Sequence, residues 1–348
     1  MGRGNANWES SVDVLDQVEA IETALADSGR ATRRIAFTRN LAAFLKEMRE
    51  KEIDAVFNLC ETVEEDPALC WHPAAVLELL NVPFSGSPSR ALALTSDKAL
   101  AKKLLKANGI RTPEFRDYGS PEIFDPTGLA FPVIVKPLME DASIGIDQES
   151  IFESANALMK KIENFRVRFG QIMVEEYIEG KEFNVSLIGY PEARVLPVAE
   201  IDFSAFPNEL YKIVGYRAKW VRDSFEYKNT PRRFLAEVSS GISPELGSVA
   251  SACFELFGLR DYGRVDMRVD DQDRIYVLEI NANPCLSPDA GLAASYAREG
   301  SNYEQMTNEL CKYMERRSRK RTSGRCSFPS DRPSDRRLRG GWAQTRED

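Results

Sequence analysis

The sequence predicts a protein of the α/β (α+β) class that is built from several parts. The chain has 348 residues, whereas a single domain commonly holds about 100–200. Stretches with apolar side chains at helical spacing alternate with short runs rich in β-branched and aromatic residues, which is typical of sheets flanked by helices. Apolar residues make up 43% of the chain and charged residues 29%, so a sizeable core is expected.

Residues 1–95 predict an N-terminal parallel α/β domain. Two β-rich runs, 33–37 and 53–59, alternate with helical stretches over 41–52 and 73–81. This order favours a parallel sheet with helices on its faces. A helix over 11–28 comes before them, and such a domain normally opens on a strand. The first strand is therefore expected to be missing.

Residues 96–181 and 182–314 form the second and third predicted regions. The second combines two helices, expected over 97–109 and 151–165, with two strands, expected over 131–137 and 171–180. The third carries several strand-like runs and a helix near 243–257.

From Arg316 onward the composition shifts to arginine, serine, glycine and proline. Such a segment cannot bury a core, so residues 315–348 are expected to be a basic, disordered tail. A solvated extension and an arm that binds anions or nucleic acid are both open interpretations.

Composition limits the chemistry. The chain has one histidine, which excludes metal sites made of several histidines. Its formal charge of -8 makes nucleic acid an improbable partner for the whole chain. Six cysteines without a C-x-x-C pair indicate reduced thiols, and neither a signal peptide nor a membrane span is evident. A cytoplasmic protein without membrane contact is expected.

Residues 263–284 predict a hairpin. With its turn centred between Gln272 and Asp273, Asp266 lies opposite Glu279. Two carboxylates directly opposed on a sheet repel each other, and a hard cation between them would remove this conflict.

Arg264 and Asn281 form the next opposed pair of the hairpin, on the same face. Asp266, Glu279 and the amide oxygen of Asn281 are therefore candidate ligands of Mg²⁺. The alternative is a solvent-facing strand pair whose acidic side chains are neutralised by Arg268 or Arg274.

Two lysines stand where a cation is unfavourable unless an anion is near. Lys136 ends an apolar strand, and Lys98 lies in the first turn of a helix, where the macrodipole disfavours cations. Residues 140–146 could cover a phosphate, because small residues let backbone N–H groups approach an anion. The alternative is a pair of ordinary surface lysines and an ordinary loop.

Taken in order, several motifs resemble the ATP-grasp ligases of the D-alanine–D-alanine ligase type, over about residues 11–314. They are VPFSGSPSRALALTSDK (82–98), FPVIVKPLMEDASIGI (131–146), VEEYIEGKEF (174–183), GRVDMRV (263–269) and LEINANP (278–284). The resemblance implies an ATP-grasp fold in which two α+β lobes clamp ATP. It also implies ATP-dependent joining of a carboxylate and an amine through an acyl phosphate, with D-alanyl-D-alanine formation as the specific candidate.

The resemblance implies roles for matching residues. Lys98, Lys136, Ser143 and Gly145 would hold the ATP phosphates, Glu175 and Ile178 would lie at the adenine, and Glu182 would bind the ribose hydroxyls. Lys219 would reach the γ-phosphate and Arg264 would stabilise charge at the reacting centre. Asp266, Glu279 and Asn281 would hold two Mg²⁺ ions.

The chain departs from the family pattern at positions where the resemblance implies contact with the substrates. Ala290 and Ala142 replace serines, Asp289 replaces a histidine, and Trp220 replaces a tyrosine. The N-terminal glutamate that binds substrate in the family has no evident counterpart. We therefore expect retained ATP chemistry with an altered pocket for small-molecule substrates. The alternative is a non-catalytic or degenerate ATP-binding or regulatory protein, and a homodimer is possible.

Overall fold

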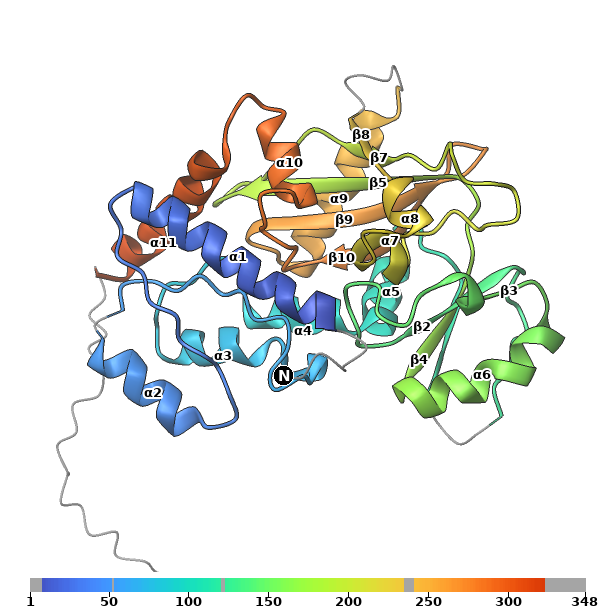
Figure 1. Cartoon of the computed structure of the whole chain (residues 1–348), viewed down its shortest axis with the longest axis horizontal. Coiled ribbons are helices and arrows are strands. Elements are labelled where there is room, and N and C mark those ends of the chain that lie inside the picture. The colour runs from blue at the N-terminus through green and yellow to red at the C-terminus, as the bar shows by residue number, and fades with distance from the viewer. Residues whose placement is uncertain (1–7, 52, 120–122, 235–240, 323–348) are drawn as a thin grey trace, which may run out of the picture.

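The computed structural model describes residues 8–51, 53–119, 123–234 and 241–322. In Figure 1 a large sheet lies above the N-terminal helices, and a smaller sheet stands beside them. None of the helices in these ranges combines the length and the apolar character needed to cross a bilayer.

The described N-terminal part is helical, with one short 3-10 turn. It contains α1 (Trp8–Asp27), α2 (Leu41–Glu50), η1 (Pro67–Leu69), α3 (His72–Leu79) and α4 (Ser89–Ser96). The helices expected over 11–28, 41–52 and 73–81 are confirmed within a few residues.

The predicted strands 33–37 and 53–59 are wrong. Within the described residues up to Ser96 no strand forms, and the expected parallel sheet is reduced to a single parallel bridge between Val56 and Phe84. A strand of a parallel sheet needs at least one hydrogen-bonded neighbour, and such sheets are covered by helices on both faces. The run 33–37, which carries Arg33 and Arg34, has no such neighbour among the described residues.

The small sheet is antiparallel, with strand order β1-β4-β2-β3. Its strands are β1 (Phe115–Tyr118), β2 (Val133–Pro137), β3 (Ile151–Phe152) and β4 (Ile172–Glu176). One face packs on α6 (Ala155–Phe169) through alternate residues such as Val135 and Val174. Alternation of side chains therefore puts Lys136 and Glu175 on the opposite face.

The helix expected over 151–165 begins later than predicted. Ile151 and Phe152 pair with β2 as β3, after the 3-10 turn η2 (Gln148–Ser150). Ser154 then caps α6 by accepting a hydrogen bond from the N–H of Ala157.

The large sheet has strand order β10-β9-β5-β7-β8, with β6 also paired to β5, and all its described pairs are antiparallel. Its strands are β5 (Lys181–Gly189), β6 (Arg194–Val195), β7 (Ala199–Ile201), β8 (Arg232–Phe234), β9 (Asp261–Val269) and β10 (Ile275–Asn281). The associated helices are α5 (Lys98–Ala107), α7 (Tyr216–Trp220), α8 (Phe225–Lys228), α9 (Ser243–Phe257), α10 (Gly291–Ala297) and α11 (Tyr303–Thr322).

The two faces of the large sheet differ in character. Odd-numbered side chains of β5 and β9, such as Val185 and Met267, pack with α9 and with N-terminal helices in the main core. Even-numbered side chains, including Asn184 and Asp266, lie on the other face, which is polar near the middle of these strands.

The predicted register of the hairpin β9–β10 is confirmed at the two residue pairs that form the candidate site. Asp266 pairs with Glu279, and Arg264 pairs with Asn281. Nearer the turn the register shifts by one residue between Val277 and Glu279. A β-bulge absorbs Leu278 there, and Val277 is fully buried.

The first part of the tail expected over 315–348 is helical, so the predicted boundary at residue 315 is wrong. Helix α11 continues to Thr322, and the buried Arg317 on it pairs with Asp261. Residues 323–348 lie outside the described residues. The local composition did not predict this part of the helix, because the buried charge of Arg317 is stabilised by Asp261, which is distant in the sequence.

Candidate functional site

The two opposed carboxylates of the hairpin have different partners. Asp266 accepts hydrogen bonds from Arg264 Nε at 2.7 Å and Arg264 Nη2 at 2.9 Å, and a third from Asn184 Nδ2 at 2.8 Å. Neither Arg268 nor Arg274 pairs with Asp266 or Glu279 in the described structure, because they pair with Glu182 and Asp270 instead. The alternative of a solvent-facing strand pair neutralised by those arginines is therefore not supported.

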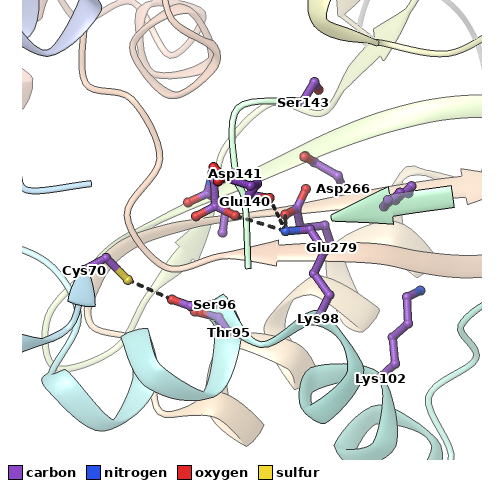
Figure 2. A network of polar contacts seen from close by, with 12 residues as sticks. Cys70, Thr95, Ser96, Lys98, Lys102, Glu140, Asp141, Ser143, Asp266 and Glu279 are labelled. Atoms are coloured by element: carbon purple, nitrogen blue, oxygen red, sulfur yellow. Dashed lines mark hydrogen bonds and ion pairs between the residues drawn. The ribbon is translucent and has the colours of Figure 1, made fainter. Parts of the chain in front are cut away.

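Lys98 is buried, with 7% of its surface exposed. It follows Asp97, which caps α5 by accepting from the N–H of Leu100. Figure 2 shows its side chain extending from α5 toward Asp141 and Glu279. Lys98 Nζ lies 3.4 Å from Asp141 Oδ1 and 3.5 Å from Glu279 Oε1. It also donates to the carbonyl of Glu140. The surface-lysine alternative fails for Lys98.

Glu175 is held between two lysines. The residue is 1% exposed, and its Oε2 lies 2.7 Å from Lys102 Nζ while Oε1 pairs with Lys136 Nζ. Burial disfavours its charge, but the two ammonium groups outweigh burial and lower the pKa of Glu175. Sequence reasoning missed Lys102, although it lies four residues after Lys98 on the same helix face.

Four cations from different elements act on Glu279. Burial alone would raise its pKa, but Lys98, Lys219, Lys136 and Arg264 lower it to about 2. These residues come from α5, α7, β2 and β9. The fold therefore gathers the predicted phosphate lysines around one predicted metal ligand.

The loop over residues 138–147 is fastened to the segment that carries Lys219. Ser143 Oγ donates to the carbonyl of Val214 at 2.8 Å, and the N–H of Tyr216 donates to the carbonyl of Ile146 at 2.8 Å. Gly145 has φ +74°, and a Cβ there would lie 2.6 Å from Phe169 Cζ. Only glycine fits this position without rearrangement.

Two positions that depart from the family pattern, Ala142 in this loop and Trp220 at the end of α7, contact each other. Trp220 Nε1 donates to the carbonyl of Ala142 at 2.8 Å. The Trp220 indole is therefore hydrogen-bonded to the backbone of Ala142, the position at which the family pattern has a serine.

The segment between β4 and β5 contains Ile178, and Glu182 follows at the start of β5. The Ile178 carbonyl accepts from Arg268 Nη1 at 2.6 Å, and Glu182 Oε2 accepts from Arg268 Nη2 at 2.9 Å. A Cβ on Gly180 would lie 2.0 Å from the carbonyl oxygen of Val269, so this turn requires glycine.

The donor set suits a hard cation. Asp266, Glu279 and Asn281 offer oxygen atoms only, which Mg²⁺ prefers, together with substrate phosphates. The amide oxygen of Asn281 accepts from the N–H of Asn283 at 3.1 Å and retains a second lone pair. Within the described residues no group of three or more His, Cys, Asp or Glu side chains forms a metal-binding cluster.

A polar cluster formed by Asp13, Gln17, Glu61 and Cys285 was missed by sequence reasoning. Gln17 Nε2 lies 3.2 Å from both Asp13 Oδ2 and Glu61 Oε1. Its Oε1 accepts from the N–H of Leu286 at 3.0 Å, and Cys285 Sγ lies 3.3 Å from Asp13 Oδ2. No lysine or arginine of the described residues forms an ion pair with either carboxylate.

Burial raises the pKa of Glu61 to about 7, and Lys219 opposes this effect from nearby. The cluster therefore lies within electrostatic reach of Lys219. A cavity of about 500 Å³ lies elsewhere and is lined by residues such as Arg111, Ser248 and Asp273. None of the predicted site residues lines it.

The fold and this site define an ATP-grasp protein. The sequence model of the family "D-ala D-ala ligase C-terminus" matches residues 105–312. The D-alanine–D-alanine ligase of Carboxydothermus hydrogenoformans is 30% identical over 308 residues, covering 84% of this chain and 90% of that protein. The uncharacterised protein y4sG of Sinorhizobium fredii is 32% identical over 265 residues, covering 75% of each chain.

Solved structures agree on the fold. The D-alanine–D-alanine ligase of Bacillus anthracis complexed with ATP superposes with a TM-score of 0.68 at 22% identity, covering 92% of this chain and 97% of that one. The chain belongs to the D-alanine–D-alanine ligase family. It is an ATP-dependent, Mg²⁺-using ligase that forms a C–N bond between a carboxylate and an amine, and its substrates are small molecules.

Proposed function

We propose that this ligase phosphorylates a small carboxylate with ATP on the polar face of the large sheet, and that it uses two Mg²⁺ ions. The ion pair of Lys98 with Glu279, directly opposite Asp266 and its partner Arg264 on the hairpin, carries this proposal. Phosphoryl transfer depends mainly on positioning and on cations that stabilise the spreading negative charge. A site without a catalytic histidine is therefore chemically sufficient.

The proposed roles follow the resemblance to the ATP-grasp ligases, and the contacts of Glu175 modify one of them. Lys98 and Lys136 hold phosphate oxygens, and the 138–147 loop, through Ser143 and Gly145, covers them. Ile178 and Glu182 contact the adenosine. Glu175, which is enclosed by Lys102 and Lys136, acts by fixing these ammonium groups more than by touching the base.

Asp266, Glu279 and Asn281 hold Mg²⁺, which neutralises phosphate charge when bound. Lys219 and Arg264 stabilise the charge at the reacting centre. An oxygen of the substrate carboxylate attacks the γ-phosphorus as its bond to ADP breaks. The amine nitrogen then attacks the acyl carbon, the C–O bond breaks, phosphate leaves, and the amine gives up a proton.

The substrate pocket differs from the family pattern, and we propose that its amine or acid substrate differs too. Trp220 and Ala142 close one side through their hydrogen bond. Asp13 and Glu61 present two carboxyl groups without an ion-pair partner among the described residues, which suits the ammonium group of a substrate. Asp289 would repel a second carboxylate nearby.

Release of phosphate from Mg-ATP tests the proposal, with D- and L-amino acids and simple diamines offered in pairs and each product identified by mass spectrometry. Amine-dependent turnover with a condensed product supports a ligase with this site. ATP binding without turnover in any pair would favour the non-catalytic alternative. Turnover of D-alanine at an efficiency normal for the family would contradict the altered pocket. A homodimer and a cytoplasmic location stay predictions of the sequence.

A further inference from the structure

Arg268 is a buried arginine for which the proposed reaction has no use. Only 3% of its surface is exposed. It lies on β9 two residues after Asp266, on the same face of the sheet, and directly opposite Glu182 of β5. A buried charge is costly unless fixed partners satisfy it, so the partners of Arg268 indicate what it does.

The guanidinium of Arg268 joins the two residues proposed to contact the adenosine to the segment that carries Lys212. Nε and Nη2 donate to Glu182 Oε2 at 3.2 Å and 2.9 Å, and Nη1 donates to the carbonyl of Ile178 at 2.6 Å. Nη2 also donates to the carbonyl of Lys212. The ring of Tyr177 lies against the guanidinium, with its centroid 4.8 Å away.

Both hydrogen bonds from Arg268 to the carboxylate end on one oxygen of Glu182. Within the described structure, the other oxygen, Oε1, accepts no hydrogen bond. A glutamate side chain can normally rotate about its terminal bond. The forked, planar guanidinium restricts that rotation and fixes where the second carboxylate oxygen lies.

We propose that Arg268 is a positioning residue that presents Glu182 Oε1 to the ribose hydroxyls, and so sets a preference for ribonucleotides over deoxyribonucleotides. The inference rests on the proposed function, in which Glu182 binds the ribose. Arg268 acts through Glu182, because four of its five N–H donors already bond to Glu182 Oε2 and to two backbone carbonyls.

The test compares equilibrium binding of Mg-ATP and Mg-2′,3′-dideoxy-ATP to the full chain. The wild-type protein is expected to bind ATP about tenfold more tightly, the effect of one hydrogen bond to a charged group. Arg268→Met should lower the affinity for ATP by about that factor and leave the affinity for the dideoxy nucleotide unchanged. Arg274→Met, an exposed arginine of the same hairpin that pairs with Asp270, is the matched control and should keep the wild-type ratio.

Two further variants keep the test decisive if Arg268→Met does not fold. Arg268→Lys retains the charge but loses the fork, and it should reduce the ratio between the two nucleotides. Glu182→Gln should reduce it as well. Equal losses for both nucleotides in the Arg268 variants would overturn the inference, because a merely structural role predicts that result. A wild-type protein that binds ATP without preferring the ribose would also overturn it, whereas a wild-type protein that binds neither nucleotide contradicts the proposed function itself.

Discussion

Asp261 and Arg317 form a buried ion pair across 56 residues of sequence. Asp261 Oδ2 accepts from Arg317 Nη2 at 2.8 Å and from the N–H of Gly86 at 2.9 Å. Arg317 Nη2 also donates to the carbonyl of Phe84 at 2.6 Å. The pair joins α11, the start of β9 and the N-terminal part, so these three segments stabilise one another.

Arg317→Met should lower the free energy of unfolding by about 3–5 kcal/mol, because it leaves the charge of Asp261 buried without its partner. Chemical denaturation measures this change. Arg316→Met, at an exposed neighbouring arginine, should change stability by less than about 0.5 kcal/mol. The double variant Arg317→Met with Asp261→Asn should recover part of the loss. An unaltered stability in Arg317→Met would show that the pair does not hold α11 in place.

Lys136→Ala should weaken binding of Mg-ATP by roughly 10- to 100-fold, since a hydrogen bond to a charged group contributes about 1.5–3 kcal/mol. Calorimetric titration measures the affinity. Lys160→Ala, at an exposed lysine of α6, serves as the control. An unchanged affinity for ATP would place the phosphates away from Lys136.

Glu279→Gln should reduce ATP turnover by roughly 10²–10³-fold, the usual cost of losing one group that stabilises charge in the transition state. The variant should fold, because Lys98 retains its contacts with Asp141 and the Glu140 carbonyl. Phosphate release measured over a range of Mg²⁺ concentrations checks the assignment. Glu255→Gln, an exposed position on α9, is the control, and an unaltered Mg²⁺ dependence in Glu279→Gln would contradict a metal-binding role.

Glu61→Gln should change how stability depends on pH. The folded chain raises the pKa of Glu61 from 4.5 to about 7 by burial. Below about pH 4.5 the carboxyl is protonated in both the folded and the unfolded chain. Between about pH 4.5 and 7 the unfolded chain ionises first, so this carboxyl makes the wild-type protein less stable as pH rises.

Relative to Glu61→Gln, the wild-type protein should therefore lose up to about 3 kcal/mol between pH 4.5 and 7 and change little above that range. Denaturation curves at several pH values measure the difference. Glu65→Gln, an exposed glutamate of the same segment, should track the wild type. A pH-independent difference between wild type and Glu61→Gln would mean that Glu61 stays ionised in the fold.

The hairpin β9–β10 shows which part of the candidate site local sequence could predict. Alternation along each strand was enough to put Asp266 opposite Glu279, because side-chain direction on a strand repeats every two residues. The bulge at Leu278 did not disturb this pairing, since it falls between the site and the turn. The helices that carry Lys98 and the main core were likewise predictable from apolar periodicity.

The missing N-terminal strands and the continued α11 were not predictable in this way. A strand at 33–37 depends on neighbours that the fold does not supply, and the helical residues after Met314 depend on Asp261, which is distant in the sequence. Asp13 and Glu61 were missed because they come together only through Gln17 and the loop after β10.

The sequence by itself determined the family, the ATP-linked chemistry and the set of charged residues, because motifs and strand alternation are local properties of the chain. Only the tertiary structure decided the partner of each charge: Lys136 with Glu175, Arg268 with Glu182, and Arg317 with Asp261. Desolvation makes an unpaired buried charge unfavourable, so these partners are selected by packing between distant segments, which no local pattern records.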